Sequence, residues 1–164
     1  MTDRPILFLD VDGVLNRLGP HPSKEPANQY ARMVVPPLDA QGQQVHLHLE
    51  RADANRVRLL GGQFELVWAS TWEDHANTVL GPLLGLGRFP VARQEPGDWG
   101  SKVPGLLRYA GDRPFAWVDD DTDERDLALL GGFGSQRAVI TDPNIGLTGA
   151  HVTALLRWAA HITR

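Results

Sequence analysis

The sequence predicts an α/β domain built on a mainly parallel sheet. Short, continuously apolar runs alternate along the chain with stretches of helical pattern, as expected for strands that are buried on both faces and covered by helices. The length of 164 residues suits a single domain, 1–164, with enough chain for a full core. A hydrophobic fraction of 42% and a charged fraction of 22% are ordinary for a globular protein.

Four apolar runs are the predicted strands of this sheet. The first, residues 6–9, is β-prone and contains no polar residue. Two later runs, FELVWA and FAWV, repeat the pattern, and a short AVI run is a candidate fourth strand. The predicted strands cover residues 6–9, 64–69, 115–118 and 138–140.

Five stretches have the composition and boundaries of helices. Residues 51–60 are rich in Ala, Arg and Leu, and the following glycines, Gly61 and Gly62, are a typical helix stop. Thr148 is expected to cap the last helix, which carries one apolar face. The predicted helices cover residues 51–60, 73–80, 103–110, 123–130 and the stretch from Thr148 to about 161.

Two regions interrupt the alternation. Residues 18–44 are rich in Pro, Gly, Gln and Asn, and residues 45–49 then alternate apolar and polar as a half-exposed strand does. Together they predict a flap or minimal cap excursion over 18–50, with a flexible connection as the alternative. Residues 81–100 are a second irregular stretch.

Composition excludes several classes of protein and site. The chain has no cysteine, which rules out disulfides, thiol nucleophiles and thiolate metal sites. A net charge of −4 argues against strong general binding of nucleic acid or membrane surfaces. No run approaches the ~18–20 apolar residues of a membrane span, and the N-terminus lacks a signal peptide. We therefore expect a cytoplasmic protein.

Polar residues gather where the predicted strands end. Each has an ordinary explanation by itself, such as an acidic turn, a helix cap or a solvated lysine. In an open parallel sheet, however, ligands bind outside the carboxyl ends of the strands, so these residues should converge on one edge. They are Asp10 and Asp12 after the first strand, Ser70 and Thr71 after the second, Asp119 and Asp120 after the third, and Lys102 ahead of the third.

This combination of groups indicates phosphoryl chemistry with Mg²⁺. Carboxylate oxygens without thiols suit Mg²⁺ better than zinc or copper, and Mg²⁺ commonly holds a substrate phosphate as well. One carboxylate can attack phosphorus, while a second, two residues later, protonates the leaving oxygen and then activates water. A hydroxyl and an ammonium group can hold the phosphoryl oxygens as charge is redistributed.

The same residues resemble the haloacid dehalogenase-like (HAD) superfamily. The stretch DVDGVLN, residues 10–16, is similar to its first motif. The order of the motifs and their placement after strands agree over roughly residues 5–121. The other three motifs are matched by Ser70 with Thr71, by Lys102, and by the pair Asp119 and Asp120.

The resemblance implies roles for the acidic residues. Asp10 would be the nucleophile and Asp12 the general acid/base. Mg²⁺ would be held by the Asp10 side chain, the Asp12 backbone carbonyl and an acidic residue of the fourth motif. Asp120 is favoured over Asp119 for that last ligand, with Asp119 in support.

The resemblance also implies how phosphate is held and which reactions are run. Ser70, Thr71 and Lys102 would bind the phosphate, and Ser70 is the better match of the two hydroxyl residues. Ser70 and Lys102 would also be catalytic residues. An aspartate at position 12 is similar to the phosphatase and phosphomutase branches of the superfamily, and not to the dehalogenases.

A narrower resemblance is to small, largely capless HAD domains, some of which are associated with RNA repair proteins. It rests on WASTW at 68–72, WVDDD at 117–121, and the residues DP and GLT within 142–148. It implies a three-layer α/β/α, Rossmann-like fold with a short flap and no full cap. An open site of that kind could accept a phosphorylated small molecule or a nucleic-acid end, or a partner could act as its lid; the sequence identifies no protein partner.

The leading hypothesis is therefore a Mg²⁺-dependent phosphatase that hydrolyses a phosphomonoester through an aspartyl-phosphate on Asp10. One alternative is a phosphotransferase or mutase of the same family. Another is a non-catalytic module that binds a phosphate or a nucleic-acid end.

Three further side chains leave alternatives open. Trp72 and Trp99 either line a pocket or pack as core and loop anchors. Arg17, just past the first motif, either meets substrate charge or is an ordinary exposed charge.

Overall fold

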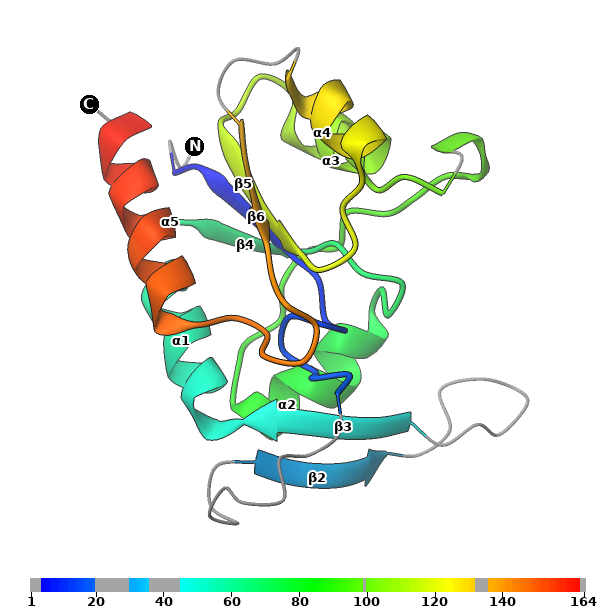
Figure 1. The fold of residues 1–164 in the computed structure, drawn as a ribbon, viewed down its shortest axis with the longest axis vertical. Coiled ribbons are helices and arrows are strands. Elements are labelled where there is room, and N and C mark those ends of the chain that lie inside the picture. Colours follow the sequence, from blue (N-terminus) through cyan, green and yellow to red (C-terminus); the bar gives the residue numbers. More distant parts are fainter. Residues whose placement is uncertain (1–3, 20–29, 36–44, 99, 132–135, 163–164) are drawn as a thin grey trace.

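The computed structural model describes residues 4–19, 30–35, 45–98, 100–131 and 136–162. Its main sheet has four strands in the order β4-β1-β5-β6, and each neighbouring pair is parallel (Figure 1). All four predicted strands are present, and no end differs from the prediction by more than two residues. They are β1 (Ile6–Leu9), β4 (Glu65–Trp68), β5 (Phe115–Asp119) and β6 (Gln136–Ile140).

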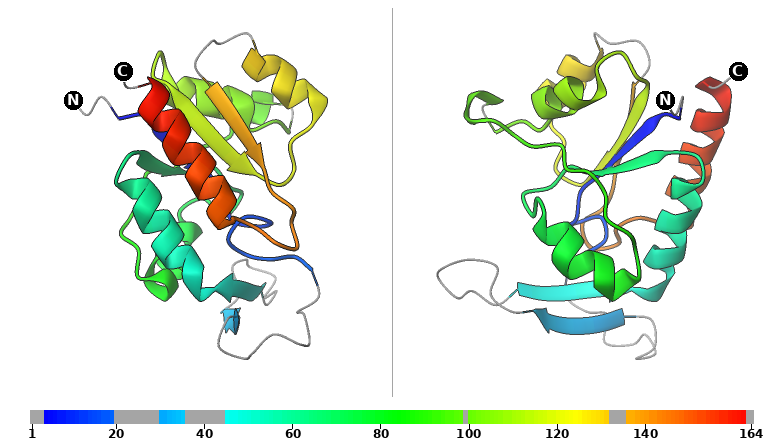
Figure 2. Two further views of the ribbon diagram at one scale, coloured as in Figure 1. Left: turned by 60° about the vertical axis from the view of Figure 1, so that its left-hand side comes forward. Right: turned by 180° about the vertical axis from the view of Figure 1, so that it is seen from behind.

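Helices cover both faces of this sheet, so the domain has three layers, as the sequence predicts. Helices α1 (Arg51–Gly61) and α5 (Gly149–Ile162) pack on one face. Helices α3 (Val103–Ala110) and α4 (Glu124–Gly131) pack on the other (Figures 1 and 2). The fold is therefore α/β and Rossmann-like.

The central strand β1 shows why its residues are continuously apolar. Leu7 and Leu9 enter the core beneath α1 and α5, whereas Ile6 and Phe8 enter the core beneath α3. All four side chains are fully buried. Because successive side chains of a strand point to opposite faces, a strand between two helical layers must be apolar at every position.

Thr148 caps α5, as predicted. The backbone N–H of His151 donates to Thr148 Oγ1 at 3.3 Å, and the backbone N–H of Thr148 donates to His151 Nδ1 at 3.2 Å. This reciprocal pair has the form of a capping box, in which two N–H groups at the helix start are satisfied by side chains.

The predicted helix at 73–80 is wrong in its start and its type. Glu73 has a φ of 45°, which a right-handed helix cannot contain, so a turn precedes the helix. A π-helix follows over Ala76–Leu80, and α2 covers Gly81–Leu84 within the stretch expected to be irregular. Pro82 stands near the start of α2 and lacks the N–H that a continuous α-helix would need there.

Two described stretches of the excursion at 18–50 pair as antiparallel strands, called the β2–β3 hairpin below. Its strands are β2 (Tyr30–Val35) and β3 (Val45–Glu50), separate from the main sheet (Figure 1). Leu47 and Leu49 are buried against the core, in keeping with the half-exposed strand predicted here. The parts of the excursion at 20–29 and 36–44 lie outside the described residues.

The order of the strands creates the place for a site. After β1 the chain travels over one face, through α1, to reach β4. After β5 it travels over the other face, through α4, to reach β6. The loops that leave β1 and β5 therefore separate, and this point of divergence is where open parallel sheets bind ligands. In the described ranges, every helix is too short or too polar to cross a membrane.

The loop that leads to α3 is anchored by an ion pair. Both carboxylate oxygens of Asp98 accept from the Arg108 guanidinium, at 2.8 and 2.7 Å, and Asp98 Oδ2 also accepts from the backbone N–H of Glu95 at 2.8 Å. The hydrogen bonds from Arg108 and from the Glu95 backbone lower the pKa of Asp98 from 3.8 to about 2. The pair thus fixes the loop, which includes Lys102, against α3.

Replacing Asp98 with Asn should lower the melting temperature near neutral pH, because Arg108 loses its closer and more buried ionic partner and keeps only Glu95 at 3.5 Å. Since the pKa of Asp98 is lower in the folded chain, the stabilisation is complete above 3.8 and is lost as the pH falls toward about 2. The difference in melting temperature between the parent and Asp98→Asn should therefore shrink over that interval. Thermal denaturation followed by circular dichroism at several pH values measures this difference.

The exposed residue Asp112, in the turn before β5, offers the matched control. Asp112→Asn should leave the melting temperature nearly unchanged at every pH. A deficit for Asp98→Asn that is as large at pH 2 as at neutral pH would contradict the role of this ion pair.

Candidate active site

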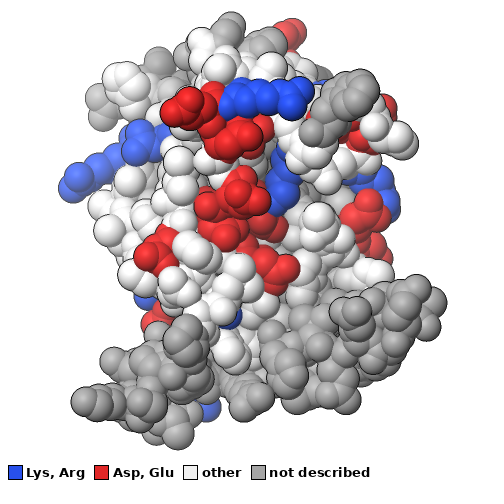
Figure 3. Space-filling view, turned by 45° about the vertical axis from the view of Figure 1, so that its right-hand side comes forward, with Lys and Arg blue, Asp and Glu red and all other residues white. Residues whose placement is uncertain are grey.

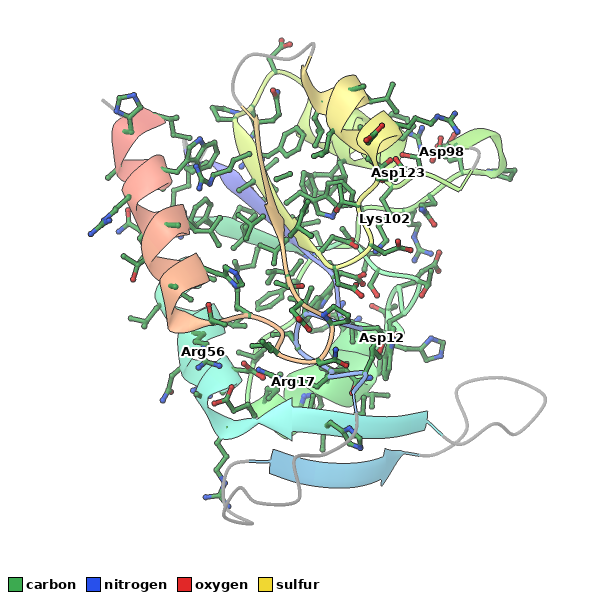
Figure 4. The ribbon with its side chains drawn as sticks, viewed as in Figure 1. Asp12, Arg17, Arg56, Asp98, Lys102 and Asp123 are labelled. Carbon is green, nitrogen blue, oxygen red and sulfur yellow. The ribbon has the colours of Figure 1, made fainter. Side chains whose placement is uncertain are left out.

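A single ammonium group joins two strands at the carboxyl edge of the sheet. Asp10 directly follows β1, Asp119 ends β5, and Lys102 directly precedes α3. The Nζ of Lys102 lies 2.5 Å from Asp10 Oδ2 and 2.6 Å from Asp119 Oδ2. Asp10 and Asp119 are only 6% and 1% exposed, so these contacts are shielded from solvent. Lys102 and Asp12, which lie on loops at this edge, are labelled in Figure 4.

Burial and like charge dominate the electrostatics of this group. Burial, with the nearby charge of Asp10, raises the pKa of Asp119 from 3.8 to about 7, although Lys102 opposes the rise. Burial works against the charged form of Lys102, but the carboxylates of Asp10 and Asp119 outweigh it and raise the pKa of the ammonium. The cluster therefore holds more negative charge than one lysine neutralises.

A third carboxylate, that of Asp120, completes the acidic cluster. Asp10, Asp119 and Asp120 each offer one oxygen, and these oxygens lie within 4.8 Å of one another. Burial, followed by the charge of Asp10, raises the pKa of Asp120 as well. Three hard oxygen donors around an excess of negative charge fit a divalent cation such as Mg²⁺.

Asp119 and Asp120 differ in how many donors they already have. The Asp119 carboxylate accepts from Lys102, from the Trp117 indole N–H at 3.1 Å and from the backbone N–H of Asp121 at 3.0 Å. Asp120 is half-buried and lies beside the turn that follows β1. The Asp120 side chain is therefore better placed to face a ligand, and Asp119 to orient Lys102.

The turn after β1 depends on a glycine. Gly13 has a φ of 70°, and a Cβ at this position would overlap the carboxylate of Asp120. The Gly13 N–H donates to the Asn16 carbonyl at 2.7 Å, which closes the turn. Gly13 thus meets a backbone requirement and allows Asp120 to approach the first motif.

Distant residues of the chain hold this turn from the other side. The Thr141 hydroxyl donates to the Gly13 carbonyl at 2.9 Å, and the Leu147 N–H donates to the Val14 carbonyl at 2.8 Å. The first motif is thereby fixed against the segment between β6 and α5.

Ser70 and Thr71 lie beside Lys102 at the same edge. Ser70 is buried and its Oγ accepts from the backbone N–H of Trp72 at 3.4 Å, whereas Thr71 is exposed. The structure therefore places the two hydroxyl residues and the lysine around one hollow. This hollow is lined by Ala69, Ser70, Thr71, Glu73, Ala92, Gln94 and Lys102.

Two donors hold Asp12, and the sequence predicts neither of these contacts. Asn16 Nδ2 donates to Asp12 Oδ1 at 2.7 Å, and Trp72 Nε1 donates to Asp12 Oδ2 at 2.9 Å. Trp72 is 6% exposed and packs in the core, which is the second of the two alternatives left open for it. Nothing in a single sequence pairs it with Asp12, because 60 positions separate the two. Trp99 lies outside the described residues.

Arg17 matches neither alternative, because it is buried. It is 5% exposed and ion-pairs with Asp53, which is fully buried, and with Glu50 at 3.0 Å. Its Nε donates to the Ile145 carbonyl at 3.1 Å. A buried arginine is stable only when paired, and the acidic partners at the start of α1 could not be located from the sequence around Arg17.

One face of the molecule is acidic at its centre. Figure 3 shows Asp and Glu side chains gathered at the centre of one face, with basic side chains beside them. Negative charge on this scale raises the local concentration of cations.

The chain is similar to solved structures only at low sequence identity. No curated protein matches the sequence. A solved structure from Legionella pneumophila, assigned to the HAD superfamily (subfamily III A) hydrolases, is 18% identical; the match covers 98% of this chain and 86% of that chain, with a TM-score of 0.48.

Two further structures are similarly distant. One from Streptomyces avermitilis, assigned to the HAD hydrolases, is 17% identical over 95% of this chain and 84% of that chain, with a TM-score of 0.48. A hypothetical protein from Xanthomonas campestris is 16% identical over 98% of this chain and 86% of that chain, with a TM-score of 0.49. Likenesses at this level do not assign a family.

A match to a family model assigns the family. The model for the HAD domain in Swiss Army Knife RNA repair proteins matches residues 6–152, which include β1, β6 and all the candidate site residues. The resemblance seen in the sequence is therefore confirmed at the level of the family. The chain belongs to the HAD domains of Swiss Army Knife RNA repair proteins.

Proposed function

We propose that this protein is a Mg²⁺-dependent phosphatase that hydrolyses phosphomonoesters through an aspartyl-phosphate on Asp10. The observation that carries the proposal is the contact of Asp10 with Lys102, 2.5 Å, beside the hollow lined by Ser70 and Thr71. A carboxylate, an ammonium group and a hydroxyl pair thus lie together at one strand edge, which supports the proposal.

In the first step, an oxygen of the Asp10 carboxylate attacks phosphorus and forms a P–O bond. The bond from phosphorus to the leaving oxygen breaks, and Asp12 transfers its proton to that oxygen, which departs as an alcohol. Lys102 and Ser70 hold the phosphoryl oxygens while their charge is redistributed.

In the second step, water attacks the phosphorus of the aspartyl-phosphate. Asp12, now a carboxylate, takes a proton from the water as the new P–O bond forms. The bond between phosphorus and Asp10 breaks, which restores the Asp10 carboxylate and releases inorganic phosphate. The side chains of both aspartates return to their starting states.

Mg²⁺ would be held by the side chains of Asp10 and Asp120 and by the backbone carbonyl of Asp12, with Asp119 in support. Bound there, it would neutralise charge shared between the carboxylates and the substrate phosphate. The three carboxylates within reach of one another, and the raised pKa of Asp119, support this assignment.

Two substrate classes are proposed: a phosphorylated small molecule and a phosphorylated nucleic-acid end. The family is named for RNA repair proteins, which supports the second class. The exposed position of Thr71 at the rim of the hollow would allow a large substrate to present its terminal phosphate. A screen that includes nucleotides and oligonucleotides with 5′- or 3′-phosphates distinguishes the two classes.

Asp10→Asn should abolish turnover of an aryl phosphate in the presence of Mg²⁺, because the amide cannot form the acyl phosphate. Asp12→Asn should lower kcat by about 10² to 10⁴-fold, the usual contribution of general acid/base catalysis. Release of inorganic phosphate measures both rates. The control Asp112→Asn, on an exposed turn away from the site, should retain the parent rate. Full turnover by Asp10→Asn would refute the assignment of Asp10 as the nucleophile.

Mg²⁺ should raise the melting temperature of the parent protein independently of any substrate. A ligand present at 100 times its dissociation constant stabilises the folded state by about 2.7 kcal/mol, or very roughly 5–10 °C for a chain of this size. Asp120→Asn should reduce this shift because it removes a proposed ligand. Differential scanning fluorimetry with and without Mg²⁺ measures the shift, with Asp112→Asn as control. A shift in Asp120→Asn equal to that of the parent would contradict the assignment of Asp120 as a Mg²⁺ ligand.

A further inference from the structure

The carboxylate of Asp12 is fixed at both of its oxygens. Asn16 Nδ2 donates to one oxygen at 2.7 Å and Trp72 Nε1 donates to the other at 2.9 Å. Each carboxylate oxygen has two lone-pair positions, so each retains one that can carry or accept a proton. The indole and the amide only donate in these bonds, so they orient Asp12 without competing for its proton.

The orientation of the Asn16 amide is itself determined. Its Oδ1 accepts from the backbone N–H of His48 at 2.8 Å, and the residue is 3% exposed. A flipped amide would point its oxygen at the Asp12 carboxylate and its NH₂ group at the His48 N–H, and both contacts would be repulsive. Asn16 therefore joins the backbone of β3 to Asp12 in one defined way.

Trp72 fixes the second oxygen of Asp12. Its ring is buried in the core, and its backbone N–H donates to Ser70 Oγ at 3.4 Å. The segment that carries the phosphate-binding hydroxyl thus also carries the second donor to Asp12. Asp12 is held between this segment and the hairpin strand β3.

We infer that Asn16 and Trp72 are positioning residues for the general acid/base, and that Asn16 makes the placement of Asp12 depend on the β2–β3 hairpin. The inference rests on the proposed function, because it assigns the two residues to the proton transfers of Asp12. Loss of either donor lets the carboxyl rotate away from the leaving oxygen. The cost is greatest for a substrate whose leaving group needs that proton.

Leaving-group dependence separates positioning from a general structural role. A nitrophenyl phosphate needs little protonation as it departs, whereas an alkyl phosphate needs a full proton. Trp72→Phe and Asn16→Ala should therefore lower kcat/KM for the alkyl phosphate by about tenfold more than for the nitrophenyl phosphate, a fraction of the general-acid contribution. Damage to the fold alone would lower both values by the same factor.

Trp68 supplies a matched control for the indole. It is also a buried tryptophan, but its Nε1 donates to Asn77 Oδ1 at 3.0 Å and not to Asp12. Trp68→Phe should change stability without changing the ratio of kcat/KM for the two substrates. Melting temperatures of all the variants identify any that are unfolded. Asn16→Leu, which keeps the volume of the side chain but loses the donor, replaces a misfolded Asn16→Ala.

A pair of substitutions at His48 tests the link to the hairpin. His48→Ala retains the backbone N–H that Asn16 accepts, whereas His48→Pro removes it. The proline variant should reproduce the change in substrate ratio seen for Asn16→Ala, and the alanine variant should keep the parent ratio. An equal ratio in the two folded variants would overturn the link to β3.

Asp12→Asn distinguishes failure of this inference from failure of the proposed function. If Asp12→Asn loses no more activity on the alkyl phosphate than on the nitrophenyl phosphate, Asp12 is not the general acid and the proposed function is wrong. If Asp12→Asn discriminates but folded Trp72→Phe and Asn16 variants keep the parent ratio, the positioning role alone is overturned.

Discussion

The contact of one ammonium group with two buried carboxylates governs the architecture of the site. Because β1 and β5 are parallel neighbours, their ends bring Asp10 and Asp119 together, and two shielded negative charges would repel each other. Lys102 lies within 2.6 Å of both and offsets this repulsion. Removing one partner from such a buried group typically costs about 3–5 kcal/mol, so the position of α3 and of its preceding loop is tied to the chemistry of the strand ends.

Other parts of the structure keep that lysine in place. Ser101 precedes it, and its hydroxyl donates to Asp126 of α4 at 2.5 Å while accepting from the Val103 N–H at 3.1 Å. The ion pair between Asp98 and Arg108 anchors the same loop from the other end. Both helices on this face of the sheet therefore help to set the geometry of a single ammonium group.

The parts of the molecule that follow from local pattern were predictable. Strand β1 is apolar at every position because helices cover both of its faces, and parallel strand ends share an edge, so the meeting of Asp10, Lys102 and Asp119 could be expected. Long-range contacts were not predictable: neither the burial of Arg17 nor the bond from Trp72 to Asp12 leaves a periodic trace. The helix start after Glu73 was missed because its positive φ contradicts ordinary propensity.

The bonds between the first motif and residues 141–147 also order events during synthesis of the chain. Gly13 and Val14 accept from Thr141 and Leu147, and the Gly13–Thr141 pair is separated by 128 positions. Domains acquire long-range contacts only when both partners have left the ribosome. The turn that holds Asp10 and Asp12 is made before the segment between β6 and α5, yet it reaches its final shape only after that segment has emerged. A nascent chain that stops at β5 therefore has its acidic residues but not their geometry.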